Sequence, residues 1–213
     1  MTASFRPEAE MQVNGRVAVW EPPRRLVLDG GEAAEGLTFE WLVDEGEGGT
    51  CIVRLVNSGF GSGEAADAEL DGMTAGWQLF LVNLRLHLEH FARQTATATL
   101  PTAMWAGPRD TTWSTLTDAL GIPAAPAAGE RIAVSGPDAP ELAGTVVDAA
   151  PWRLALLLDR PAPGTAFIAA EGDGEQVAVS IWSHLYGPEG AEAARRDEPR
   201  WREWLSERAA SAA

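Results

Sequence analysis

The sequence contains no lysine, so all 16 of its basic residues are arginines. A glycine-rich phosphate loop uses a lysine to hold its nucleotide, and the glycine-rich segment at residues 59–63 therefore predicts no nucleotide site. Acidic residues number 31 and the formal net charge is −15, which disfavours the clustered cations that nucleic acid or an anionic membrane surface requires. We expect no nucleic acid and no membrane among the partners of this protein.

Cysteine is also scarce, because Cys51 is the single one and an internal disulfide is excluded. Cys51 precedes Ile52 and Val53 in a strand-like run, so we expect a small buried hydrophobe rather than a reactive thiol. No apolar run approaches the length of a membrane span, and residues 1–20 lack the apolar core of a signal peptide. With the alanine-, glycine- and proline-rich composition, these absences predict a soluble, cytoplasmic bacterial protein.

The first part of the chain predicts four short strands joined by turns. The strands are expected at residues 12–20, 24–29, 37–43 and 50–57, each with alternating or β-branched apolar residues. Pro22 and Pro23 interrupt the first two, because proline has no N–H to donate to a ladder. The short connections favour an antiparallel meander.

One long helix is expected next, with an apolar stripe from about Leu70 to Phe91. We predict that this stripe lies on the concave face of the preceding sheet and that sheet and helix enclose an apolar pocket. His87 borders the stripe and is the predicted polar contact of this pocket. The pocket candidates are Phe39, Trp41, Trp77, Phe80, Leu84 and His87.

The rest of the chain repeats this order loosely. Residues 95–100 form a linker or a strand, and Asp110 is the predicted N-cap of a short helix that ends at Gly121. Strand-like segments follow, and a last helix at residues 189–208 has Trp201, Trp204 and Leu205 on its inward face. The segments are residues 131–135, 143–148, 153–158, 165–170 and 176–184. The predicted fold class is α+β, with a sheet packed on a long C-terminal helix, in tandem modules at residues 1–95 and 96–213.

Three runs resemble the activator of heat-shock protein 90 ATPase homolog-like family, of the START/SRPBCC (Bet v allergen-like) superfamily. They are VAVWEPPRRLVL, GGTCIVRLVNSGF and GWQLFLVNLRLHLEHF, and the resemblance covers about residues 12–93. It implies a helix-grip fold, in which a curved antiparallel sheet surrounds a long C-terminal helix and leaves a cavity. Superfamily relatives bind hydrophobic ligands, and some act as cyclases.

The resemblance also implies a departure at the amino terminus. Family members begin with a strand and two short helices before the segment equivalent to Gln12, whereas eleven residues precede it here. We expect a first module that is shortened at its N-terminus and has an open edge strand, or a start site placed too far downstream. The second module is expected to be a degenerate copy of the first.

Catalytic and metal-binding motifs are not recognised. His87 and His90 share a helix face with Asn83 but lack a third metal ligand, and His184 has no nucleophile motif beside it. We therefore expect no metal, no cofactor and no catalytic residue. The sequence favours a non-catalytic protein that binds a small apolar ligand, or a cochaperone-like contact with a protein client, with a homodimer also possible at the open edge. The alternatives are a cyclase- or hydratase-type enzyme that uses the same pocket and a purely structural, vestigial module.

Overall fold

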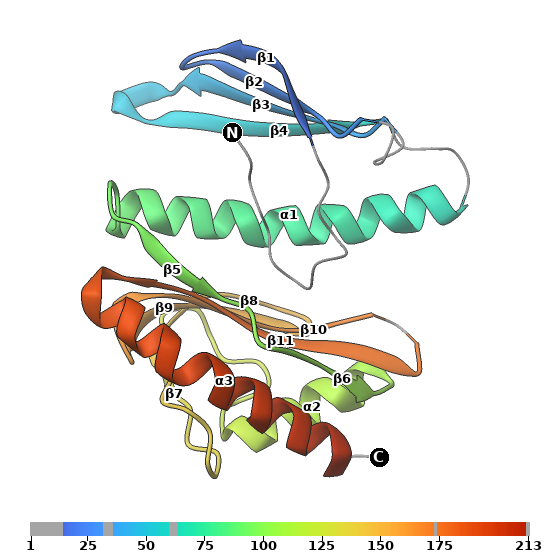
Figure 1. The fold of residues 1–213 in the computed structure, drawn as a ribbon, viewed down its shortest axis with the longest axis vertical. Coiled ribbons are helices and arrows are strands. Elements are labelled where there is room, and N and C mark those ends of the chain that lie inside the picture. The colour runs from blue at the N-terminus through green and yellow to red at the C-terminus, as the bar shows by residue number, and fades with distance from the viewer. Residues whose placement is uncertain (1–14, 32–35, 60–63, 173, 212–213) are drawn as a thin grey trace. The chain divides into compact units, whose positions relative to one another are not determined.

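Two antiparallel sheets and three α-helices make up the described part of the chain, as the computed structural model shows in Figure 1. The structure describes residues 15–31, 36–59, 64–172 and 174–211. The chain forms two compact units, Met1–Ala75 and Gly76–Ala213. Helix α1 (Glu64–His90) runs from the first unit into the second. The predicted modules at residues 1–95 and 96–213, and their relation as tandem copies, stay predictions.

The first unit contains the predicted four-stranded meander. Strands β1 (Arg16–Glu21), β2 (Arg25–Asp29), β3 (Thr38–Glu45) and β4 (Cys51–Ser58) pair antiparallel in chain order. The prolines form the tight turn between β1 and β2, where Arg24 N donates to Glu21 O at 2.8 Å. Residues 12–14, the beginning of the first predicted strand, lie outside the described residues.

The register of this sheet separates an apolar face from a mixed one. Leu26 pairs with Trp41 and Trp41 with Leu55, so these three side chains share a face, and each is half-buried. Cys51 is the first residue of β4, directly after the hairpin loop, and it is exposed. The prediction of a buried Cys51 was therefore wrong, because the strand begins there rather than passing through the core.

The second unit is built on a seven-stranded sheet. Its elements are β5 (Ala96–Thr99), β6 (Thr102–Ala106), α2 (Arg109–Leu120), β7 (Arg131–Ala133), β8 (Ala143–Ala150), β9 (Arg153–Arg160), β10 (Gly164–Glu171), β11 (Gln176–Tyr186) and α3 (Gly187–Ser211). The strand order is β5-β11-β10-β9-β8-β7, and β6 also pairs with β11. Pro101 separates β5 from β6, since proline cannot continue a ladder. Residues 95–100 are thus largely a strand of this sheet, and β6 was not predicted.

Helix α3 packs on one face of the second sheet through the residues that were predicted to face inward. Trp201, Trp204 and Leu205 are buried there in one hydrophobic cluster with Trp105 and Trp113. The indole N–H groups of Trp105 and Trp204 donate to backbone carbonyls, Leu205 O and Pro137 O, both at 3.0 Å. An α+β unit with an antiparallel sheet and a long C-terminal helix confirms the predicted helix-grip fold class.

The ends of α2 differ in part from the prediction. Gly121 ends the helix in the left-handed conformation, with φ 67°, as a C-cap glycine should. The N-cap is Pro108, whereas Asp110 lies in the first turn and accepts a hydrogen bond from Trp152 Nε1 at 2.6 Å. The predicted N-cap at Asp110 was wrong because the helix begins earlier, at Arg109.

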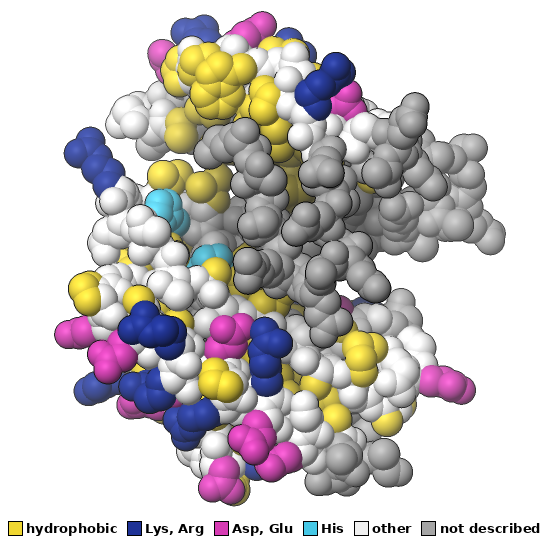
Figure 2. Space-filling model, viewed as in Figure 1, with side chains coloured by type: hydrophobic (Ala, Val, Ile, Leu, Met, Phe, Trp, Pro, Cys, Tyr) yellow, Lys and Arg dark blue, Asp and Glu magenta, His cyan; other side chains and the backbone are white. Residues whose placement is uncertain are grey.

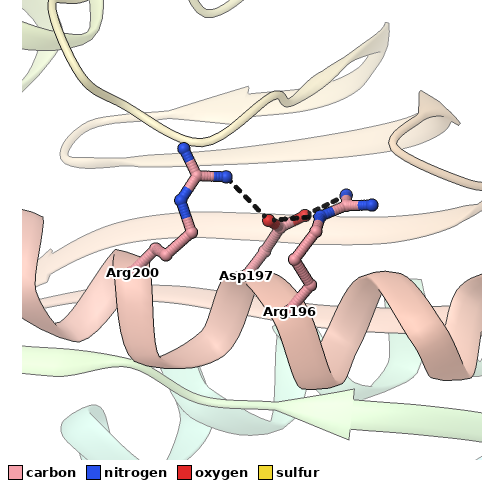
Figure 3. A network of polar contacts seen from close by, with 3 residues as sticks. All are labelled: Arg196, Asp197 and Arg200. Atoms are coloured by element: carbon pink, nitrogen blue, oxygen red, sulfur yellow. Dashed lines mark hydrogen bonds and ion pairs between the residues drawn. The ribbon is translucent and has the colours of Figure 1, made fainter.

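A buried carboxylate lies on α3 among the charged residues of that helix. Asp197 is 4 % exposed and accepts hydrogen bonds from Arg196 Nε at 2.9 Å and Arg200 Nη1 at 3.0 Å (Figure 3). The hydrogen bond to Asp197 raises the pKa of Arg196. Acidic and basic side chains are interspersed over the face that carries α3 (Figure 2). The two guanidinium groups satisfy a carboxylate that would be costly to bury alone.

Two leucines on helices test this assignment of the core. Leu205 of α3 is 0 % exposed, whereas Leu88 of α1, which was predicted to face the first sheet, is 51 % exposed. We expect Leu205→Ala to lower the free energy of unfolding by about 2–5 kcal/mol, because it leaves a cavity. Leu88→Ala should change it by less than about 1 kcal/mol.

Urea unfolding followed by far-ultraviolet circular dichroism would measure both variants. Equal losses in the two would contradict the position of the core between the second sheet and α3.

Candidate functional site

The face of the second sheet opposite α3 differs in chemistry from the α3 face. Along β11, Ile181 and Leu185 point into the cluster under α3, whereas Trp182, His184 and Tyr186 alternate with them and point the other way. The paired strand β10 adds Phe167 opposite Trp182 and Thr165 opposite His184. One face is thus apolar, and the other combines aromatic rings with polar groups.

The part of α1 that belongs to the second unit covers this aromatic face. Leu79 is buried in a cluster with Phe167 and Ala155, against which Val82 and Trp182 also pack. The ring of Phe80 meets that of Trp182 edge-on, with 4.8 Å between centroids. Residues 76–90 are therefore held to the sheet by aromatic and aliphatic contacts on one side of the helix.

A chain of polar contacts runs through the same interface. Thr165 Oγ1 donates to Asn83 Oδ1 at 2.8 Å, and Asn83 Nδ2 lies 3.5 Å from His184 Nε2. The opposite ring nitrogen of His184, Nδ1, is buried and has no hydrogen-bond partner among the described residues. This series of polar contacts thus ends at a nitrogen without a hydrogen-bond partner, which is unusual in a protein interior.

A second polar pair lies one helical turn further along α1. His87 Nδ1 is 2.9 Å from the hydroxyl of Tyr186, and the two rings are stacked at 5.7 Å. The ring of Phe91 also stacks on that of Tyr186, with 4.0 Å between centroids and an interplanar angle of 8°. Asn83 and His87 therefore point to the same sheet, as their spacing of four residues dictates.

Burial controls the protonation of both groups on β11. Desolvation, with a smaller Coulombic contribution from nearby His87, lowers the pKa of His184 from 6.5 to about 4. Desolvation raises the pKa of Tyr186 above 10. At neutral pH the histidine imidazole and the tyrosine phenol are therefore both uncharged, and the interface holds neutral hydrogen-bonding groups.

The predicted pocket residues fall into both units. Phe39 and Trp41 lie on β3 in the first unit and are half-buried. Trp77, Phe80, Leu84 and His87 lie on α1 in the second unit and are half-buried as well. Of these, Phe80 and His87 make ring and hydrogen-bond contacts with β11. That all six line one pocket stays a prediction.

Sequence reasoning missed the partners that β10 and β11 supply, namely Thr165, Trp182 and Tyr186, and set His184 aside. Trp182, His184 and Tyr186 occupy alternate positions of one strand, and that alternation was the available signal. It was hidden because the intervening positions are also apolar or small, so both faces of the strand look buried. His90, by contrast, is exposed and lies 4.0 Å from Glu89.

Among the residues that the structure describes, no group of three His, Cys, Asp or Glu side chains could hold a metal ion. Within the described helices, none has the length and apolar character needed to cross a bilayer.

Comparison with solved structures gives only remote likenesses. A Mesorhizobium loti protein, MLL2253, shares 15% identity, with 51% of this chain and 93% of that one covered and a TM-score of 0.40. The di-domain ARO/CYC BexL of the BE-7585A biosynthetic pathway shares 15% identity over 92% and 74% of the chains, with a TM-score of 0.35. The di-domain ARO/CYC StfQ of the steffimycin pathway shares 14% over 88% and 76%, with a TM-score of 0.32.

The amino-terminal part of the chain has a clearer relationship. No curated protein matches the sequence. Residues 2–89, which comprise the first sheet and all but the last residue of α1, match the family described as Activator of Hsp90 ATPase homolog 1-like protein. This match includes the first two runs on which the resemblance was based, and the third run up to Glu89. Residues 2–89 are therefore similar to the Activator of Hsp90 ATPase homolog 1-like family, in a match that covers less than half of the chain.

Proposed function

We propose that this protein is a non-catalytic binding protein for a small apolar molecule that carries a polar group. The molecule would lie between residues 76–90 of α1 and the face of the second sheet opposite α3. The observation that carries this proposal is the buried, unpartnered Nδ1 of His184 among half-buried aromatic rings. Such a site, mostly apolar with a few placed polar groups, is typical of small-molecule pockets.

The aromatic side chains supply the apolar contacts for such a ligand. Trp77 and Phe80 lie 5.3 Å apart, and Trp182 contacts both Phe80 and His184, with centroids at 4.8 and 4.6 Å. All four side chains are half-buried rather than fully enclosed. A planar apolar molecule could add to this series of rings by offset or edge contacts, which are the arrangements that aromatic groups prefer.

The opposite face of the sheet offers less support for a ligand site. The tryptophans and leucines under α3 are buried in one cluster, and the indole N–H groups of Trp105, Trp113 and Trp204 already donate to backbone carbonyls. A ligand there would have to displace side chains that are close to fully buried, at a cost of several kcal/mol.

The protonation of His184 favours binding over catalysis. A general acid or base works best with a pKa near the operating pH, whereas the pKa of His184 is about 4. The neutral imidazole can still donate or accept a hydrogen bond. We therefore place His184, together with His87 and Asn83, as ligand contacts and not as catalytic residues.

The neutral state of His184 makes stability depend on pH. Its pKa is 6.5 unfolded and about 4 folded, so the unfolded chain binds the proton first as the pH falls. The stability that this histidine contributes is complete above about pH 6.5 and is lost toward pH 4, by about 3 kcal/mol. We expect His184→Gln, which does not titrate, to show a shallower loss over this range.

Urea midpoints of wild type and variant at several pH values between 7 and 4 would measure this difference. The matched control is His90→Gln at the exposed histidine, whose pH profile should follow that of the wild type. Parallel profiles for wild type and His184→Gln would contradict burial of the neutral ring.

Binding itself can be tested with the neutral fluorescent probe 6-propionyl-2-(dimethylamino)naphthalene, a planar ketone. We expect saturable binding to wild type and about tenfold weaker binding to Phe80→Ala, because an aromatic contact worth about 1 kcal/mol or more is removed. The matched control is Trp20→Ala, since Trp20 is 65 % exposed and lies on β1 in the first unit.

Circular dichroism would verify that each variant is folded. Unsaturable fluorescence with wild type, or equal affinities for folded wild type and Phe80→Ala, would count against this function and this location.

A further inference from the structure

We propose that the ligand is recognised through one neutral acceptor oxygen, a carbonyl on a planar apolar framework, which accepts a hydrogen bond from Nδ1–H of His184. Asn83 and Thr165 set the direction of that bond. This inference rests on the proposed function and adds the chemical class of the ligand. It follows from the order of donors and acceptors in the polar chain.

The argument begins at Thr165, whose hydroxyl donates to the amide oxygen of Asn83 at 2.8 Å. The structure places the amide oxygen of Asn83 toward Thr165 and its NH₂ group toward His184 Nε2, 3.5 Å away. An NH₂ group can only donate, and Nε2 must therefore be the acceptor, without a hydrogen. In a neutral imidazole the hydrogen then lies on Nδ1.

The Nδ1–H group is thus a donor with a fixed direction. Among the described residues it is buried and has no acceptor. A buried donor without a partner is costly, and a ligand oxygen that accepts from it removes this cost. A ligand group that can only donate would face another donor and would be disfavoured for the same reason.

The acceptor is expected to be neutral because the surroundings oppose charge. Burial holds the imidazole neutral at pH 7, and His87 and Tyr186 are the titratable groups that α1 and β11 place beside it. A carboxylate would enter this interface without a paired cation at His184, and the chain as a whole carries a net charge of −15. A carbonyl needs no such compensation.

The flanking rings specify the framework that carries the carbonyl. Trp182 lies against His184 on one strand, with ring centroids 4.6 Å apart, and contacts Phe167 and Phe80 at 5.4 and 4.8 Å. Planar, fused-ring groups match such a lining better than flexible aliphatic chains, because they stack without losing rotamer freedom.

The first test needs no ligand. Long-range ¹H–¹⁵N correlation spectra of uniformly ¹⁵N-labelled wild-type protein at pH 7 distinguish the two neutral tautomers of each histidine. We expect His184 in the Nδ1–H form, with its signals assigned by their loss in His184→Gln. The Nε2–H form, or a charged ring at pH 7, would overturn the inference.

The second test compares two probes of nearly the same shape, 2-acetylnaphthalene and 2-isopropenylnaphthalene, in which C=O replaces C=CH₂. Wild type should bind the ketone about five- to tenfold more tightly, as one net hydrogen bond predicts. Asn83→Leu removes the NH₂ group that holds His184 in the Nδ1–H tautomer, and it should reduce this preference to about twofold or less. The control His90→Leu, at an exposed histidine of the same helix, should keep the full preference.

The outcomes separate the two proposals. Equal affinities of wild type for ketone and hydrocarbon would overturn the inference that the ligand needs an acceptor oxygen, and would leave the proposed binding function standing. Failure of both probes to bind would overturn both. A ketone preference that survives in folded Asn83→Leu would remove Asn83 as the residue that fixes the tautomer and would overturn the proposed mechanism of recognition.

Discussion

The burial of both faces of β11 is the constraint on which the second unit depends. Val179, Ile181 and Leu185 fill the side toward α3, and Trp182 and His184 fill the side toward α1. A central strand with both faces covered cannot slip by one residue, because a slip would exchange the two sets of side chains. The positions of both helices on this sheet follow from that fixed register.

The two faces of the sheet solve the burial of polar groups differently. Under α3 the polar groups are indole N–H groups and hydroxyls bonded to backbone carbonyls, as Trp105 to Leu205 O and Thr117 to Trp113 O illustrate. Under α1 the polar groups are side chains that bond to one another. A side-chain network specifies one arrangement of helix and sheet more narrowly than apolar packing does, and an incomplete network leaves a group available to bind something else.

The side chains of this network are uncharged because they are buried. Desolvation lowers the pKa of His184 and raises that of Tyr186, so both groups stay uncharged over the physiological range. Uncharged groups can be buried at modest cost when bonded. This differs from Asp197 on α3, whose carboxylate accepts hydrogen bonds from two guanidinium groups. One unit thus contains a buried charge with its counter-charges and a buried histidine held without charge.

Much of the fold was predictable because it depends on local patterns. The four-stranded meander, Gly121 at the end of α2, and the inward Trp201, Trp204 and Leu205 follow from alternation, turn residues and helical spacing, which act over a few residues. The site was not, because Asn83 and His184 are 101 residues apart, and nothing local indicates that α1 lies on β11. Sequence alone determined which side chains share a face of each element. Only the tertiary structure decided which faces meet, because the hydrophobic effect is non-directional and stabilises contact with any apolar partner. Strand pairing and packing across the whole unit select among those partners.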